Sequence, residues 1–185
     1  LPFFPGYRPY QAIVYQYSLH VLEEEGGALK HFELLLTDHE DPGKRFIEGL
    51  IHDLPDSGSV IVWNQPFEGG KNLEMAERYP AYADQLLEIN QRMYDLMLIF
   101  KKGTYIDPEF GGSASLKNVL PVLVPEFRGD YAGLRISNGE EAMLAWGEIW
   151  EETIAEDDLP QIRQDLLAYC RLDTLAMVKI YEKLV

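Results

Sequence analysis

Two pairs of polar residues have a spacing that would bring the members of each pair to one point. Asn64 and Glu68 are four residues apart, where the apolar run 59–63 ends and a helix pattern begins. Both can therefore point to one spot above the carboxyl end of a strand, where open α/β sheets place their sites. Tyr169 and Asp173, also four apart, share one face of a long helix pattern. Clustered carboxylates of this kind hold Mg²⁺, and the metal supplies the charge that meets a phosphate.

Each of these residues also has a purely structural interpretation. Asn64 could be only a helix cap, and Glu68 only a first-turn carboxylate favoured by the helix dipole. Tyr169 could belong to the core and Asp173 to the surface. Asp95, which we expect at the end of a helix, is either a supporting acid near the site or a residue that faces water. The spacing alone leaves these alternatives open.

The apolar patterns predict strands first and helices afterwards. Segments 10–22 and 28–38 predict the two strands of a hairpin, and 59–63 predicts a buried central strand. Helices are expected at 44–54, twice between 66 and 97, around 115–117, at 139–150 and at 159–185. This order favours a single α/β domain over residues 1–185. A hairpin needs a further strand to form a stable sheet, and that strand is not obvious in this chain.

Composition and charge exclude several classes of protein. The 185 residues carry 16 Lys+Arg against 31 Asp+Glu, a formal net charge of −15 at pH 7. Groove-binding transcription factors and polybasic membrane-surface proteins need positive charge instead. The single cysteine, Cys170, excludes an intrachain disulfide and fits a reducing compartment. No apolar run is long enough to cross a bilayer, so we expect a cytoplasmic protein without a membrane partner.

The order of the motifs resembles that of a known superfamily. An Asn-x-x-x-acid motif follows an apolar strand, and a Tyr-x-x-x-Asp motif follows about a hundred residues later in the last helix. These two motifs are similar to the second and third motifs of the DEDDy-type 3′–5′ exonucleases. These enzymes are the 3′–5′ exonucleases of the ribonuclease-H-like superfamily whose third motif carries a tyrosine. Longer stretches resemble a bacterial domain of unknown function in the same superfamily: 9–11, 18–20, 62–65, 112–121 and 169–178.

The resemblance implies a chemistry and a role for the principal residues. In such exonucleases four carboxylates hold two divalent ions, Mg²⁺ or Mn²⁺, which activate water and stabilise the phosphate as the 3′ nucleotide leaves. Glu68 and Asp173 would then be catalytic metal ligands, and Tyr169 would orient the attacking water. The second motif carries Glu68 where the superfamily usually has Asp, and the longer side chain can still reach a metal.

The remaining candidates would contact the substrate, which the resemblance implies is the 3′ end of DNA or RNA. Asn64 would pack the turn or touch the substrate strand. Lys117 would meet a substrate phosphate, and Lys101 and Lys102 could do the same from a neighbouring loop. The chain has few positive charges, so we expect the metals and stacked aromatic side chains to assist this contact.

One part of the family pattern has no counterpart here. The first motif, Asp-x-Glu on the first strand, would fall just upstream of Leu1. We therefore expect a ribonuclease-H-like mixed β-sheet flanked by helices that lacks its first strand by truncation, in a parent with further domains upstream. The two-metal site is expected only when the upstream Asp-x-Glu is present, and the fragment alone would be inactive. Exposed sheet edges could also pair two chains into a dimer.

Two other functions remain open. A catalytically silent ribonuclease-H-like module would scaffold a neighbouring domain or bind nucleic acid. A metal phosphohydrolase acting on mononucleotides would use the same residues in a deeper pocket. An Asp-x-Glu in the dozen or so residues upstream of Leu1 favours catalysis, and its absence favours the silent module.

Overall fold

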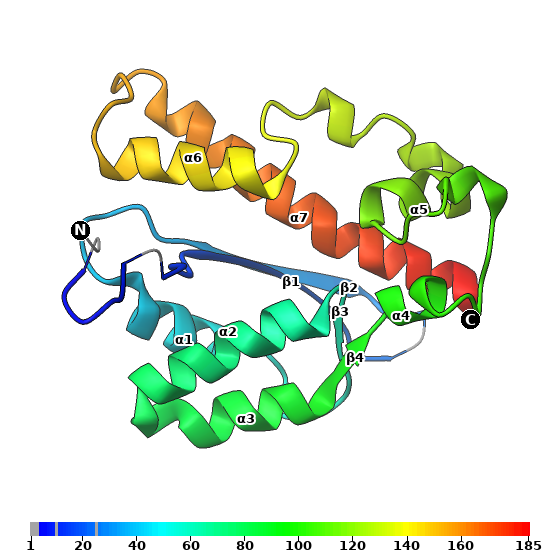
Figure 1. Cartoon of the computed structure of the whole chain (residues 1–185), viewed down its shortest axis with the longest axis horizontal. Helices are drawn as coiled ribbons and strands as arrows, with labels where there is room; N and C mark the ends of the chain where they lie inside the picture. Colours follow the sequence, from blue (N-terminus) through cyan, green and yellow to red (C-terminus); the bar gives the residue numbers. More distant parts are fainter. Residues whose placement is uncertain (1–3, 10, 25) are drawn as a thin grey trace.

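The strands of the protein lie between two groups of helices. A computed structural model describes residues 4–9, 11–24 and 26–185. In Figure 1, one side of the strands carries α1 (Pro42–Asp53), α2 (Gln65–Arg78) and α3 (Ala83–Arg92). The other side carries α5 (Leu116–Leu123), α6 (Gly139–Trp150) and α7 (Leu159–Leu184). The expected α/β class is confirmed, and a ribonuclease-H-like sheet stays a prediction.

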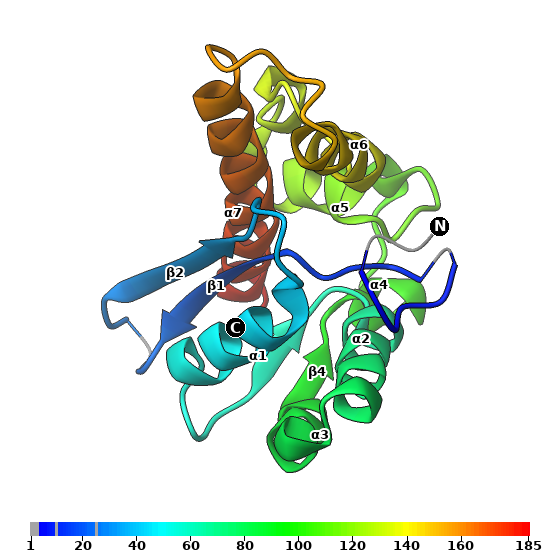
Figure 2. The same cartoon turned by 90° about the vertical axis from the view of Figure 1, so that its left-hand side faces the viewer.

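The described strands form two separate pairs. The predicted hairpin is confirmed as β1 (Gln16–Leu22) and β2 (Leu29–Leu35), which are shorter than expected and pair antiparallel. The predicted buried strand is β3 (Val60–Val62), which pairs in parallel with β4 (Met93–Asp95). The turned view in Figure 2 shows the hairpin apart from β4. Within the described residues, β1 and β3 therefore each have one edge without a strand partner.

The sequence-based placement of Asp95 at the end of a helix is wrong. Helix α3 ends at Arg92, and Met93 has an extended backbone with φ −66° and ψ 134°. The next two residues continue this extended segment, so that Asp95 lies beside Val62 of β3. Pairing with β3 therefore overrides a local pattern that predicted a longer helix. A short helix, α4 (Met97–Lys101), follows directly.

Short 3₁₀ turns connect several of these elements. They are η1 (Pro80–Tyr82), η2 (Pro108–Phe110), η3 (Pro125–Phe127) and η4 (Tyr131–Gly133). Three of them begin at proline, whose fixed φ and missing N–H suit the first position of a helical turn. The last, η4, occupies the connection between α5 and α6 and bears on the site described below.

Helix α7 is held across the hairpin by polar contacts as well as apolar packing. The Thr174 hydroxyl lies 2.8 Å from the Ser18 hydroxyl and 2.8 Å from Nδ1 of His20. Gln16 donates to the carbonyl oxygen of Leu166 at 2.7 Å. Leu166 is fully buried, whereas the Cys170 side chain is only partly covered. These contacts fix the rotation of α7 and thereby the direction in which its Tyr-x-x-x-Asp motif points.

The apolar core consists of several clusters. One joins α5, α7 and the segment after β4 through fully or nearly fully buried side chains: Leu96, Phe100, Phe110, Val119, Leu120, Val124, Ala176 and Ile180. A second lies between the hairpin, α1, α2 and α3 and contains Tyr17, Leu36, Phe46, Ile47, Met75, Ala76 and Leu86. Among the described residues, no helix is long and apolar enough to cross a membrane.

Candidate functional site

Glu68 and Asp95 meet at the carboxyl ends of the two parallel strands. Asp95 is the last residue of β4 and is 6% exposed. Its carboxylate accepts hydrogen bonds from the backbone N–H groups of Gln65 at 3.2 Å and Met97 at 3.1 Å. Glu68 lies in the first turn of α2, which begins where β3 ends. The interpretation of Asp95 as a residue that faces water is therefore wrong, and this acid lies beside the predicted acid of the second motif.

The carboxyl group of Glu68 is unusual in its surroundings. One oxygen, Oε2, is buried and has no hydrogen-bond partner among the described residues. Burial raises the pKa of Glu68 to about 7, and the nearby negative charge of Asp95 adds to the rise, although the backbone of Glu68 and Asn64 opposes it. A buried oxygen without a donor costs free energy that a bound cation or a proton would recover.

Asp173 forms a second group with two tyrosines and a lysine. The Tyr131 hydroxyl donates to Oδ1 of Asp173 at 2.6 Å, and the Tyr169 hydroxyl also hydrogen-bonds to this carboxylate. The Lys117 ammonium lies 5.4 Å from the ring centre of Tyr131 and 5.9 Å from that of Tyr169. It also donates to the carbonyl oxygen of Ser137. Tyr169 and Asp173 therefore act as a pair on one helix face, as their spacing predicted.

Burial shifts the pKa of each acidic member of this second group upward. Burial raises the pKa of Asp173, while the hydroxyls of Tyr131 and Tyr169 and the charge of Lys117 oppose the rise. Burial and the negative charge of Asp173 also raise the pKa of both tyrosines, so these phenols stay protonated and donate. Tyr169 in this environment can orient a water molecule through its hydroxyl but is too weak an acid to serve as a phenolate base.

The two groups border the same apolar cluster, the one around Leu96 and Ala176. Leu96 follows Asp95 directly, and Ala176 follows Asp173 by three residues. Tyr131 and Trp63 pack against this cluster too. In the part of the chain that the structure describes, however, no three acidic, histidine or cysteine side chains are grouped so that they could hold a metal ion. The shared metal site expected of Glu68 and Asp173 therefore stays a prediction.

The predicted substrate contacts lie on accessible surface. Asn64 is exposed, and its carbonyl oxygen accepts from the N–H groups of Phe67 at 2.8 Å and Glu68 at 3.3 Å. Asn64 is the N-cap residue of α2 by position, but its side chain makes no capping hydrogen bond within the part of the chain that the structure describes. Lys101 and Lys102 are exposed at the end of α4.

The structure adds Tyr131 to the residues proposed from the sequence. It lies in η4, 42 residues before Asp173, within the loop segment Gly129-Asp130-Tyr131-Ala132-Gly133. No spacing rule links a loop tyrosine to a helix carboxylate at that separation. The only local signal is an aromatic residue in an otherwise small and polar turn, which is common in surface loops.

Comparison with known proteins assigns the chain to a family. Residues 1–115 match the model of a domain of unknown function, DUF2779, and the chain belongs to that family. It is 31% identical over 136 residues to the uncharacterized protein UU173 of Ureaplasma parvum. The aligned region covers 66% of this chain and 20% of that protein. It is 27% identical over 187 residues to the MG366 homolog of Mycoplasma pneumoniae, covering 93% of this chain and 28% of that protein.

The chain thus spans between a fifth and a third of the length of these relatives. The names of these relatives assign them no activity. No solved structure matches the chain.

Proposed function

We propose that this chain is part of a divalent-metal-dependent 3′–5′ exonuclease domain of the ribonuclease-H-like superfamily. Its substrate is a DNA or RNA strand with a free 3′ end. Glu68 and Asp173 bind the metals, Tyr169 orients the attacking water, and Asn64 and Lys117 contact the substrate.

The observation that carries the proposal is the buried, unpartnered oxygen of Glu68 beside Asp95. Two carboxyl groups at the carboxyl ends of parallel strands, one with a free buried oxygen, form a natural half of a site for a hard cation. Their position suits Mg²⁺ or Mn²⁺, which prefer oxygen ligands and keep several waters. When bound, such ions activate water and neutralise the charge on the reacting phosphate.

The other half of the site requires a further strand. Among the described strands, the unpaired edges of β1 and β3 are both available for hydrogen bonding, and such edges favour pairing with a further strand. We propose that a strand from upstream of Leu1 pairs with both and brings the Asp-x-Glu acids of the first motif. This strand would join the two pairs into one mixed sheet and complete the set of four carboxylates.

The chain's own residues would then divide the remaining tasks. Tyr169 donates a hydrogen bond that holds water in line with the phosphorus atom. Lys117, an exposed cation beside Tyr131 and Tyr169, meets a phosphate oxygen. For Asp173 to accept a metal, its carboxylate must exchange the Tyr169 hydroxyl for the cation, because the single O–H of Tyr169 cannot donate to Asp173 and to water at once.

A second candidate is a catalytically silent module of the same fold that binds a neighbouring domain or nucleic acid. The observation that favours it is the hydrogen bonding of Asp173 to both Tyr131 and Tyr169, which already satisfies this carboxylate without a metal.

The test is decay of 5′-labelled single-stranded DNA and RNA by the protein extended upstream of Leu1, with Mg²⁺ or Mn²⁺. We expect a ladder that shortens from the 3′ end, and loss of at least about a hundredfold in rate for Asp173→Asn. Glu156→Gln, which removes an exposed acid on the loop before α7, is the matched control. No cleavage by a folded, metal-loaded protein would favour the silent module.

A further inference from the structure

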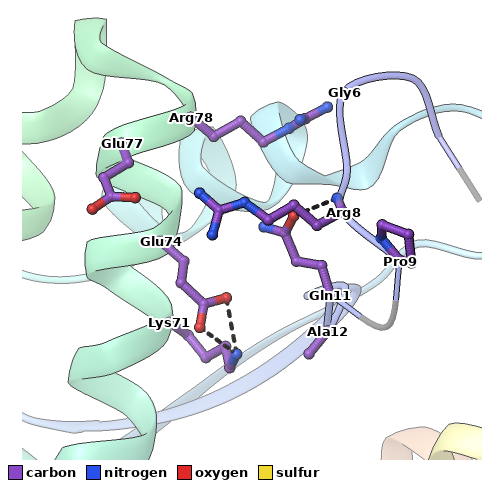
Figure 3. A pocket seen from close by; sticks show the side chains of 9 residues that line it. All are labelled: Gly6, Arg8, Pro9, Gln11, Ala12, Lys71, Glu74, Glu77 and Arg78. Carbon is purple, nitrogen blue, oxygen red and sulfur yellow. Dashed lines mark hydrogen bonds and ion pairs between the residues drawn. The ribbon is translucent and has the colours of Figure 1, made fainter. Parts of the chain in front are cut away.

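A polar cavity lies between α2 and the segment that precedes the hairpin. Its volume is about 690 Å³, within the range of small-molecule sites. Figure 3 shows the side chains that line it: Arg8 and Gln11 from the N-terminal segment and Lys71, Glu74, Glu77 and Arg78 from α2. The lining carries three cationic and two anionic side chains, so positive charge predominates here although the whole chain has 31 acidic and 16 basic residues.

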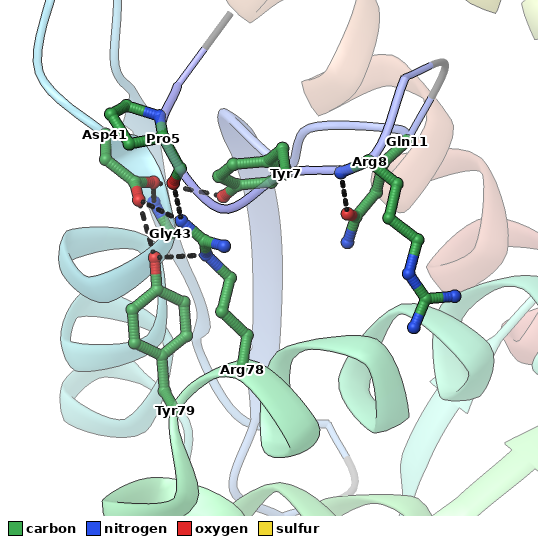
Figure 4. A network of polar contacts seen from close by, with 8 residues as sticks. All are labelled: Pro5, Tyr7, Arg8, Gln11, Asp41, Gly43, Arg78 and Tyr79. Carbon is green, nitrogen blue, oxygen red and sulfur yellow. Dashed lines mark hydrogen bonds and ion pairs between the residues drawn. The ribbon is translucent and has the colours of Figure 1, made fainter. Parts of the chain in front are cut away.

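The wall formed by Arg78 is held by several contacts. Its guanidinium lies over the ring of Tyr7, with 3.8 Å between Cζ and the ring centre. It donates to Asp41 at 3.0 Å, to the Pro5 carbonyl at 2.9 Å and to the Tyr79 hydroxyl at 3.2 Å. Figure 4 shows this network, which joins the N-terminal segment to α1 and α2. The cavity is therefore preorganised, and a ligand would not have to order this side of it.

Arg8 is the cation in the cavity that remains available. Its side chain is exposed, and Figure 3 shows its guanidinium directed toward α2. Its backbone N–H donates to Gln11 at 3.0 Å, whereas its guanidinium has no ion pair with any described residue. Lys71, by contrast, is bound by both oxygens of Glu74 at 2.8 and 2.9 Å. A planar guanidinium with free donors suits the paired oxygens of a phosphate.

We infer that this cavity binds a backbone phosphate of a single-stranded nucleic acid, with Arg8 as the contacting residue. The inference rests on the proposed function, because the cavity and the candidate site share helix α2. Lys71 lies one helical turn beyond Glu68. Phe67 is 60% exposed and lies on the same face of α2 as Lys71 and Arg78, nearer the start of the helix. From Glu68 to Arg78 the helix rises about 15 Å, roughly four stacked nucleotide steps.

This placement gives the strand a path. Its 3′ end would lie at Glu68, and the chain would run along α2 so that a phosphate several nucleotides to the 5′ side reaches Arg8. The cavity thus specifies a polymer rather than a mononucleotide, since a mononucleotide cannot occupy both ends of the helix.

The experiment measures binding of a fluorescein-labelled oligothymidylate of about 12 nucleotides to the full-length protein by anisotropy, across a salt series and in chelator. We expect Arg8→Gln to weaken binding about fivefold and to reduce the salt slope by about 0.7, the value for one lost phosphate contact on a single strand. Arg163→Gln, an exposed arginine on α7 outside the cavity, should bind as the unmodified protein does.

Equal affinity and slope for Arg8→Gln and the unmodified protein would overturn the inference, as would an equal loss in Arg163→Gln. Because the chelator removes divalent metal, this measurement does not depend on cleavage. A selective loss in Arg8→Gln together with absent cleavage would refute the exonuclease and leave the binding site. Cleavage together with unchanged binding by Arg8→Gln would refute the binding site and leave the exonuclease proposal.

Discussion

At the scale of single residues, Glu68 connects the structure to measurable chemistry. An ordinary glutamate is ionised at neutral pH, whereas burial and the charge of Asp95 raise the pKa of this one to about 7. The folded protein thus keeps a proton that the unfolded chain releases. The stabilisation from this proton is fully present below the unfolded pKa of about 4.5 and is lost as the pH rises through about 7.

Replacement of Glu68 by glutamine removes this pH dependence. We expect Glu68→Gln to be close to the parent in stability near pH 4 and more stable by on the order of 1 kcal/mol near pH 8, allowing for solvent screening. Urea unfolding of both proteins in metal-free buffer measures this difference. Glu77→Gln, further along α2, controls for loss of one charge. A constant difference between parent and Glu68→Gln across this pH range would show that Glu68 titrates normally.

At the scale of elements, the docking of α7 on the hairpin decides where Asp173 points. Thr174 follows Asp173 directly, and its hydroxyl contacts Ser18 and His20 of β1. Apolar packing by Leu166 and Ala176 anchors the helix, but these hydrogen bonds fix its rotation. Positioning of the candidate site therefore depends on a polar contact outside it.

Replacement of Thr174 by valine keeps the shape of the side chain and removes the hydroxyl. We expect Thr174→Val to lower the free energy of unfolding by about 1–3 kcal/mol, because Ser18 and His20 each lose a partner. Thermal or urea unfolding measures this change, and Thr104→Val at an exposed loop position is the control. If both variants lose the same small amount, the contact does not hold α7 in place.

Local pattern predicted the elements that are long or strongly apolar, such as β3 and α7. It failed at β4, where three residues extend only because β3 lies beside them. The pairing of Tyr169 with Asp173 followed from helix geometry. The contact of Tyr131 with Asp173 depends on how the loop around η4 folds back, and the cavity around Arg8 depends on packing of the N-terminal segment against α2. Neither has a signal in residue spacing.

At the scale of the whole molecule, the net charge of −15 and the two separate strand pairs lead to one expectation. Bound cations would offset the negative charge of this protein where a phosphate approaches Glu68 and Asp173. The described residues offer pairs of acids but no group of three metal-binding side chains. High affinity for a divalent cation would therefore come only with additional ligands.

We expect residues 1–185 alone to bind Mn²⁺ at least about tenfold more weakly than the protein extended upstream of Leu1. Calorimetric titration of both proteins at the same pH measures the difference. Replacement of the upstream acids by amides should bring the extended protein down to the affinity of residues 1–185. Equal affinity of the two unmodified proteins would mean that the upstream segment supplies no ligand.

The central claim is that Glu68 and Asp173 bind the same pair of ions in a sheet completed by another strand. A crystal structure of the extended protein with Mn²⁺, using anomalous scattering to locate the metal, tests this most directly. We predict manganese about 2.1 Å from carboxylate oxygens of Glu68 and Asp173, and a strand hydrogen-bonded to both β1 and β3. Manganese distant from either carboxylate, or an upstream segment that leaves those two edges unpaired, would contradict the claim.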